Sequence, residues 1–281
     1  MKRLKLTGLL CTYLGDDAQL LEACLASILG QTRALDELVV VFDGPVSEES
    51  YNSVMRVINS LEGIGVLVKH HMFPANVGHG LARSKGVELA TGDYVVIFDA
   101  DDISSKDRLK LLEEEAKRGN YDVIGGHIRE FSSLRGSLFG YRVVKLSHDE
   151  IYQDMFLRCP FNQTTVMIKK VALDNVGGYR DMFCNEDYEL WLRLAAAGHR
   201  FANVDVSLVD VVAPTEYFSR RGGWRYCQSE LKMQWLLFLH GKSLALFLRG
   251  VLVRLIVYLF VPTGVRRMLY RKFLRDKEWI K

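Results

Sequence analysis

Apolar residues recur with two different periods along the first hundred residues of the chain. The continuous apolar run over residues 38–42 predicts a strand buried on both faces, and a mostly apolar run over residues 6–12 predicts another. Further strands are predicted over residues 66–70 and 94–98. Apolar residues at helical spacing predict helices over about residues 20–29, 48–61 and 80–90. Because strands that alternate with helices form parallel sheets with right-handed crossovers, we expect an α/β fold of the nucleotide-binding type.

The pattern becomes less regular after residue 100. Ser104 and Asp107 have the spacing of a capping box and predict a helix that runs to about Lys117. Further strands are predicted over residues 121–131 and 166–168, with a Gly- and Ser-rich loop over 132–140. A compact helix over residues 189–197 ends at Gly198.

The last forty residues combine an apolar segment with clustered basic charge. Residues 243–261 are strongly apolar but contain Arg249 and Arg254, each of which costs ~2.5–3.5 kcal/mol at the centre of a membrane-spanning helix. From Lys242 onward there are ten basic residues against two acidic ones. We therefore expect a catalytic domain over residues 1–241 and a helical extension over 242–281 that lies on an anionic membrane surface, where each basic residue contributes ~1 kcal/mol. In the alternative, the helix packs on the domain and its arginines are simply solvated.

Composition narrows the class of protein. Hydrophobic residues make up 49% and charged residues 25% of the chain, which is typical of globular proteins and excludes a disordered or low-complexity chain. The net charge of +3 is too small for a nucleic-acid binder that acts through bulk charge. The five cysteines are scattered without a CxxC pair, which argues against a zinc ribbon and favours a reducing compartment.

An acidic cluster follows the predicted strand over residues 94–98. Asp99, Asp101 and Asp102 place three carboxylates within four residues, so they repel one another unless a cation compensates them. Oxygen ligands of this kind suit Mg²⁺ or Mn²⁺, and ligands of open α/β sheets bind at the carboxyl ends of strands. The alternative is an acidic, solvated turn that leads into the next helix.

Polar residues follow two other strands at the same predicted edge of the sheet. Cys11 and Tyr13 end the first strand, and Asp43 ends the second and precedes a glycine. A carboxylate at that position can accept a hydrogen bond from a base or a ribose, although Asp-Gly is also an ordinary turn. The coincidence of several polar strand ends favours a binding site.

Two more segments carry candidate chemistry. Asn76, Gly78 and Arg83 belong to a glycine-containing turn that opens a helix, where a phosphate could be bound, or where Arg83 could simply pair with an acid. Glu186 and Asp187 lie at the N-terminal end of the helix that stops at Gly198; acids are favoured there by the helix dipole, and one of them could also act as a general base.

Taken in order, these segments resemble the inverting family 2 glycosyltransferases, which have the GT-A fold: a Rossmann-like, mixed but mostly parallel sheet flanked by helices. The resemblance covers about residues 6–221. Its motifs are Cys11–Tyr13, LVVVFDGP at 38–45, NVGHGLARSKG at 76–86, DADD at 99–102 and NEDYELWLRL at 185–194. GGYRD at 177–181 and SRRGGWRY at 219–226 are most similar to amylovoran-biosynthesis-like transferases, which build bacterial exopolysaccharide or O-antigen repeat units.

The resemblance implies a nucleotide-sugar site. Cys11, Tyr13 and Asp43 would line a uracil pocket, with Asn76 and Gly78 beside it. Asp99 would lie near the ribose and the metal, Asp101 would bind Mn²⁺ or Mg²⁺ more directly, and Arg83 would lie near the diphosphate or the sugar. Phe42 departs from the family pattern, which often has an acid there, and no third protein ligand for the metal is evident.

The resemblance also implies a reaction. Asp187 would be the catalytic base, and Glu186 would support the acceptor site. The donor would be a UDP-hexose, and the acceptor a saccharide, in particular one linked to a lipid diphosphate, so that the enzyme works in the cytoplasm on the inner face of the cell membrane. The competing interpretations are a nucleotidyltransferase of similar fold, which normally carries a basic Gly-rich loop that residues 9–15 lack, and a non-catalytic nucleotide-binding module that docks on membranes.

Overall fold

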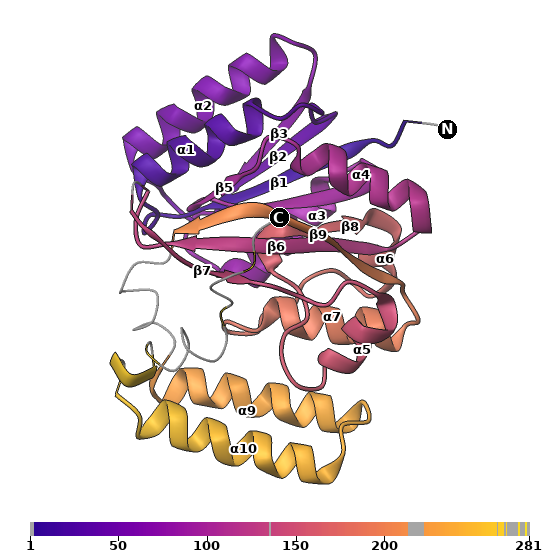
Figure 1. The fold of residues 1–281 in the computed structure, drawn as a ribbon. Coiled ribbons are helices and arrows are strands. Elements are labelled where there is room, and N and C mark those ends of the chain that lie inside the picture. The colour runs from indigo at the N-terminus through magenta and orange to yellow at the C-terminus, as the bar shows by residue number, and fades with distance from the viewer. Residues whose placement is uncertain are drawn as a thin grey trace.

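The protein is built on one mixed sheet with helices on both faces (Figure 1). The computed structural model describes residues 3–134, 136–212, 222–262, 264–266, 268, 275 and 279. Within these residues nine strands form the sheet in the order β3-β2-β1-β4-β8-β6-β9-β5, and β7 pairs with β6. The mixed, mostly parallel sheet with flanking helices is therefore confirmed.

The strands and helices have the following bounds. The strands are β1 Leu6–Thr12, β2 Glu37–Phe42, β3 Leu67–Met72, β4 Tyr94–Asp99, β5 Asp102–Ser104, β6 Val123–Phe131, β7 Leu138–Arg142, β8 Met167–Lys169 and β9 Phe201–Val212. The helices are α1 Ala18–Leu29, α2 Glu48–Glu62, α3 His79–Leu89, α4 Arg108–Gly119, α5 His148–Asp154, α6 Lys170–Asn175, α7 Glu186–Ala196, α9 Gly223–Leu239 and α10 Leu244–Leu259, with a 3₁₀ turn at Gln163–Thr165.

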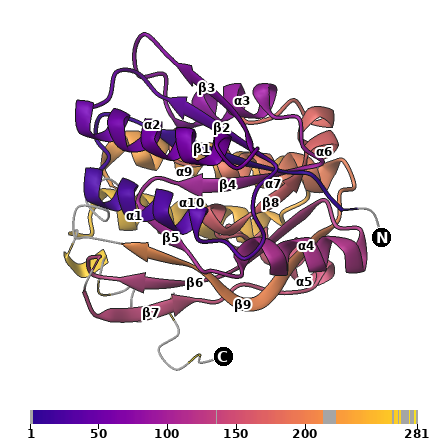
Figure 2. The ribbon, with the colours of Figure 1, turned by 90° about the horizontal axis from the view of Figure 1, so that it is seen from above.

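The first four strands are parallel, as their alternation with helices predicts. Every residue of β2 is buried, because helices cover both faces of the sheet. One core packs α1, α2 and α4 against one face, and the other packs α3, α5, α6 and α7 against the opposite face (Figure 2). A continuous apolar run is the sequence signature of a strand in this double-sided environment.

Three predictions about the second half are wrong. Ser104 does not cap a helix: it ends β5, which pairs antiparallel with β9, and α4 begins at Arg108 after Asp107. The predicted loop over 132–140 runs into strand β7, which pairs with β6. The helix predicted from residue 189 begins three residues earlier, at Glu186, so that its acids form the first turn.

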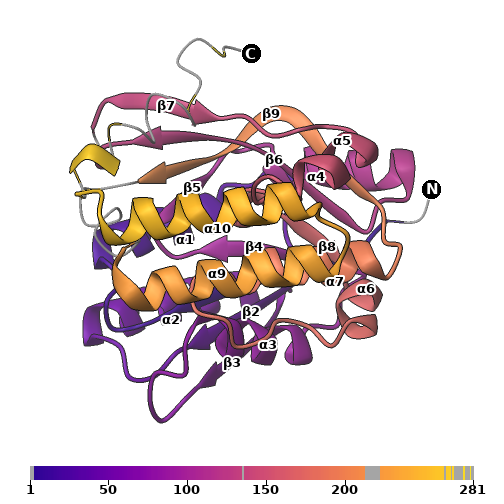
Figure 3. The same cartoon turned by 90° about the horizontal axis from the view of Figure 1, so that it is seen from below.

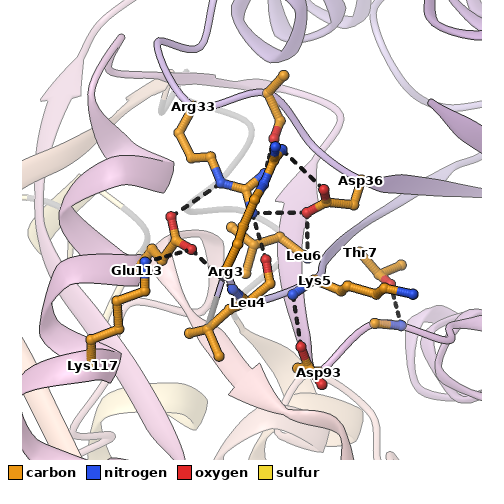
Figure 4. Close-up of polar contacts among 12 residues, drawn as sticks. Arg3, Leu4, Lys5, Leu6, Thr7, Arg33, Asp36, Asp93, Glu113 and Lys117 are labelled. Atoms are coloured by element: carbon orange, nitrogen blue, oxygen red, sulfur yellow. Dashed lines mark hydrogen bonds and ion pairs between the residues drawn. The ribbon is translucent and has the colours of Figure 1, made fainter. Parts of the chain in front are cut away.

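Ion pairs and hydrogen bonds hold together the edge at which the parallel strands begin (Figure 4). The guanidinium of Arg33 contacts Asp36 at 2.8 Å and Glu113 at 3.1 Å, and it donates to the carbonyl of Leu4. The Asp36 carboxylate also accepts from the backbone N–H of Leu6 at 2.9 Å. These bonds tie β1 to α4 at the edge opposite the carboxyl ends of the strands.

Helices α9 and α10 form a hairpin that lies beyond α7 on one side of the sheet (Figures 1 and 3). Arg254 of α10 donates to Glu230 of α9 at 2.7 Å, and Lys242 donates to Gln234 at 2.6 Å. Gly250 is the one buried residue of α10, because the side chain of Gln234 occupies the space that a Cβ would need. In the part of the chain that the structure describes, no helix is both long and apolar enough to cross a membrane.

The end of the chain returns to the sheet. The Arg275 guanidinium makes a two-point ion pair with Glu130 of β6, and both side chains are almost fully buried. The Trp279 ring packs edge-on against His127, with 4.7 Å between ring centroids. Part of the predicted basic tail and of the SRRGGWRY segment lies outside the described residues: Arg267, Arg271, Lys272, Lys277, Lys281 and residues 219–221.

Candidate active site

The polar strand ends that the sequence predicts to share one edge do so. Cys11 at the end of β1 is in register with Val41 of β2 on one side and with Asp99 of β4 on the other. Asp43 follows β2 directly, and its backbone N–H donates to the carbonyl of Thr12. Burial raises the pKa of the Cys11 thiol to about 12, so Cys11 is a neutral packing group rather than a nucleophile.

Asp43 shapes the turn that precedes α3. One carboxylate oxygen accepts from the N–H of Val77 at 2.6 Å, and the other accepts from the N–H of Gly78 at 3.1 Å and from the side-chain amide of Asn76 at 3.0 Å. Gly78 has a φ of 92°, which favours glycine. A carboxylate has about four lone-pair positions, so Asp43 retains one acceptor position for a ligand.

Arg83 joins the two halves of the site. Its Nη2 donates to Asp99 of β4 at 2.8 Å, and its Nη1 donates to Glu186 of α7 at 2.6 Å. The side chain is only 8% exposed, and it lies over the ring of Tyr179 at 5.9 Å. Although burial opposes the charge, Asp99 and Glu186 raise the pKa of Arg83 well above its ordinary value. Asp99 and Glu186 thus lie on either side of one guanidinium.

One carboxyl group of the acidic turn after β4 differs from the other two in its surroundings. Asp102 is buried, and one of its carboxylate oxygens has no hydrogen-bond partner. Burial, together with the charges of Asp101 and Asp99, raises the pKa of Asp102 well above its ordinary value. Asp99 and Asp101 are half-buried and therefore remain partly accessible to solvent.

A buried arginine lies beneath this turn. Arg108 donates to the carbonyl of Ile97 in β4 at 2.6 Å and to the hydroxyl of Ser104 in β5 at 2.9 Å. Its guanidinium lies over the Phe98 ring at 4.7 Å. Arg108 therefore connects the strands on either side of the acidic turn, a role that the sequence analysis did not assign to it.

Two aspartates of the turn fit a metal only if the substrate completes the coordination. Among the residues that the structure describes, no group of three or more His, Cys, Asp or Glu side chains is arranged to hold a metal ion. Mg²⁺, however, is commonly held by one or two carboxylates together with substrate phosphates and water. Asp99 and Asp101 supply two such carboxylates, and a bound substrate would supply the phosphate oxygens.

Asp187 lies in the first turn of α7, next to Glu186. One of its oxygens accepts from the N–H of Tyr188 at 2.7 Å, and the other is 3.9 Å from the Cys159 thiol. Burial and the neighbouring charge of Glu186 raise the pKa of Asp187 to about 6. At neutral pH Asp187 is therefore ionised, but it is a stronger base than an ordinary aspartate.

The structure also brings in residues that the sequence analysis did not single out for the site. Tyr179 from the GGYRD segment packs under Arg83, and its hydroxyl accepts from Gln163 at 2.8 Å. Arg142 at the end of β7 donates to the carbonyl of Cys159 at 2.8 Å. Tyr13 lies beside His79 at the start of α3, with 5.9 Å between ring centroids.

Comparisons with known sequences agree with this geometry. The family model described as glycosyl transferase family 2 matches residues 9–180. An uncharacterized glycosyltransferase of Haemophilus influenzae is 33% identical over 97% of this chain and 100% of its own length. A UDP-Gal:alpha-D-GlcNAc-diphosphoundecaprenol beta-1,3-galactosyltransferase of Escherichia coli is 31% identical over 96% of this chain and 97% of its own length. The amylovoran biosynthesis glycosyltransferase AmsE of Erwinia amylovora is 32% identical over 94% and 97%.

Solved structures share the fold at lower sequence identity. The mannosyltransferase PcManGT from Pyrobaculum calidifontis, solved with GDP-Man and Mn²⁺, has a TM-score of 0.65 at 17% identity and covers 98% of this chain and 77% of its own. S. aureus TarS 1–349 in complex with UDP-GlcNAc has a TM-score of 0.63 at 16% identity and covers 91% of this chain and 73% of its own. The resemblance inferred from the motifs is confirmed: the chain belongs to glycosyltransferase family 2.

Proposed function

We propose that the protein transfers a hexose, with inversion, from a UDP-sugar to a saccharide carried on a lipid diphosphate. The observation that carries the proposal is the Arg83 bridge, which places Asp99, at the donor strand ends, and Glu186, beside the base Asp187, on opposite sides of one guanidinium. The E. coli relative, named for UDP-Gal and a diphosphoundecaprenol-linked GlcNAc, supports this donor and acceptor class.

The chemistry follows from the position and basicity of Asp187. Asp187 removes the proton of the acceptor hydroxyl while the oxygen of that hydroxyl attacks the anomeric carbon of the donor sugar. The bond between that carbon and the diphosphate oxygen breaks on the opposite side, and the electron pair leaves with the UDP. A single displacement inverts the anomeric centre and needs no covalent intermediate. Glu186, fixed by Arg83, supports the acceptor side of the site.

The donor side is formed by the strand ends. Cys11 and Tyr13 would contact the uracil, and Asp43 would accept the base N–H at its remaining lone-pair position. Asn76 and Gly78, which Asp43 holds in place, would line the same pocket.

Asp99 and Asp101 would hold Mn²⁺ or Mg²⁺ together with the diphosphate of the donor. When bound, the cation neutralises charge on the departing diphosphate. Arg83 cannot replace it in that role without giving up an existing partner, because both of its terminal nitrogens already contact carboxylates. This gives a physical reason for metal dependence.

The helical hairpin would place the enzyme on the inner face of the cell membrane. The exposed face of α10 carries a stripe of aliphatic residues: Leu244, Leu248, Leu252, Val253, Ile256 and Leu259 are each at least 40% exposed. Phe260, at 77%, continues it. Contiguous apolar surface of this kind marks an interaction site, and the exposed Arg249 within it suits an anionic lipid surface.

The first experiment is a screen of nucleotide sugars for slow hydrolysis with Mn²⁺ and with a chelator. We expect hydrolysis of a UDP-hexose that stops on chelation. Transfer of a nucleotidyl group to a sugar phosphate would instead support the nucleotidyltransferase, and nucleotide binding without any turnover would support the non-catalytic module.

The second experiment tests the base. Asp187→Asn should lower the rate of transfer about 10²- to 10⁴-fold, because the proton acceptor is lost. UDP affinity, measured by calorimetry, should stay within about twofold. Asp174→Asn on α6, an exposed carboxylate paired with Lys170, is the matched control and should leave both quantities unchanged. Wild-type turnover in Asp187→Asn would reject the base assignment.

A further inference from the structure

Arg142, at the end of β7, is a cation without a carboxylate partner among the described residues. Its Nη2 donates to the backbone carbonyl of Cys159 at 2.8 Å, and its side chain is only half-buried. Two nearby arginines differ. Both terminal nitrogens of Arg83 contact carboxylates, and Arg158, which donates to the carbonyl of Val143, pairs with Asp154 at 2.9 Å.

The guanidinium of Arg142 lies beside the proposed base. It contacts Cys159, whose thiol is 3.9 Å from the Asp187 carboxylate. Although burial dominates both values, the positive charge of Arg142 acts to lower the pKa of Cys159 and of Asp187. The acceptor hydroxyl must reach Asp187 for the proton to be removed. A substituent at the other end of the same sugar ring then comes within reach of Arg142.

The same side of the molecule carries the apolar hairpin. Asn185, immediately before α7, donates to the Ser229 hydroxyl of α9 at 3.1 Å, and α10 packs beside α9 (Figures 1 and 3). The proposed base therefore lies on the same side of the sheet as the hairpin that carries the apolar stripe. A lipid-linked acceptor that enters from this side would have its anionic linkage between the lipid and the sugar that faces Asp187.

We propose that Arg142 binds the diphosphate of the lipid-linked acceptor and thereby selects diphosphate-linked sugars over neutral glycosides. The proposal rests on the proposed function. A guanidinium suits this ligand because its planar donors can bind two phosphate oxygens at once, and Arg142 has donors left over after its bond to Cys159. A cation already neutralised by a carboxylate, such as Arg158, would not attract a diphosphate in the same way.

The test compares Arg142→Met with the wild type on two acceptors, dodecyl diphosphate-linked GlcNAc and dodecyl GlcNAc without phosphate. We expect the KM for the diphosphate acceptor to rise about 10- to 100-fold, because hydrogen bonds to charged groups contribute that much. The KM for the neutral glycoside should change less than about twofold, since no ion pair is lost there. Arg142→Lys should recover part of the discrimination.

Arg158→Met is the matched control and should preserve the preference for the diphosphate acceptor. UDP affinity, measured by calorimetry, monitors folding of the donor site, and it should be the same in all variants. Equal losses on both acceptors, or a shifted pH midpoint of kcat with an unchanged KM, would overturn the proposal, because Arg142 would then act only through Asp187.

Binding of dodecyl diphosphate alone separates this proposal from the proposed function. If the wild type transfers sugar to neither acceptor, the proposed acceptor class is wrong, but the binding measurement still decides about Arg142. Weaker binding to Arg142→Met than to the wild type and Arg158→Met supports a diphosphate site. Equal binding to all three proteins overturns it.

Discussion

Two aspartates of this site have raised pKa values, each because of where its side chain lies. Asp102 is buried without a full set of hydrogen bonds beside two other carboxylates, and its pKa lies well above the ordinary value. Asp187 is also desolvated, but a backbone N–H and the charges of Arg83 and Arg142 offset part of the effect, and its pKa is about 6. The residue types alone do not distinguish these two environments.

The pKa of Asp187 predicts the pH dependence of transfer. The base acts only when it is deprotonated, so kcat/KM should fall as the pH decreases through about 6, to about a tenth of its plateau at pH 5. Folding raises the pKa of Asp187 above its unfolded value, so the folded state binds this proton more tightly than the unfolded state does. The protonated group therefore adds to the free energy of unfolding below about pH 4, and this contribution is lost as the pH rises from about 4 to about 6. A pH–rate profile with donor binding followed in parallel checks this. A rate that stays flat between pH 5 and 7 would contradict it.

At the scale of elements, one buried guanidinium connects a helix, a strand and a second helix that are far apart in sequence. Arg83 lies on α3, Asp99 ends β4, and Glu186 begins α7. The side chains of Arg83 and Glu186 are about 10% exposed or less. Removing one partner of such a pair leaves a charge that neither water nor protein compensates.

Arg83→Met should therefore destabilise the protein strongly, by about 3–5 kcal/mol in the free energy of unfolding. The measurement is urea unfolding followed by circular dichroism. Lys85→Met, two residues later on α3, is the control, because the Lys85–Glu88 pair lies at the surface, with Glu88 66% exposed, and contributes only about 0–1 kcal/mol. A loss below about 1 kcal/mol for Arg83→Met would show that the bridge is not structural.

At the scale of the whole molecule, the hairpin of α9 and α10 lies on the face that Figure 3 views from below, and α10 carries the exposed aliphatic stripe described above. Deleting residues 243–281 would not be a clean test of membrane binding, because it would also remove Arg275 and leave Glu130 buried without that partner. Substitutions on the exposed stripe leave these contacts in place.

Leu248→Asp combined with Leu252→Asp should weaken binding to anionic phospholipid vesicles about tenfold or more, since each buried leucine contributes about 1.5–3 kcal/mol. Flotation with vesicles measures the bound fraction. Val171→Asp on α6, which is as exposed as these leucines, is the control and should bind like the wild type. Equal flotation of the double variant would reject α10 as the membrane-binding surface.

The sequence alone determined the first half of the sheet and the residue types at its carboxyl edge. Strands β1, β2 and β4 are buried on both faces, so their apolar runs identify them without knowledge of their neighbours, whereas β3 at the edge of the sheet is partly exposed. The segment Phe201–Val212 alternates apolar and polar residues, and this signal could have predicted β9. The three-residue strand β5 has no such local signal.

Only the tertiary structure decided which groups share the site and how their surroundings shift their pKa values. The pairing of β5 with β9 displaced the helix expected from Ser104, because a strand that short exists only through its partner. The Arg83 bridge, the raised pKa of Asp102 and the position of Arg142 beside Asp187 each depend on side chains from separate elements. Local periodicity reports the burial of one segment, whereas ion pairing and desolvation depend on distances between segments.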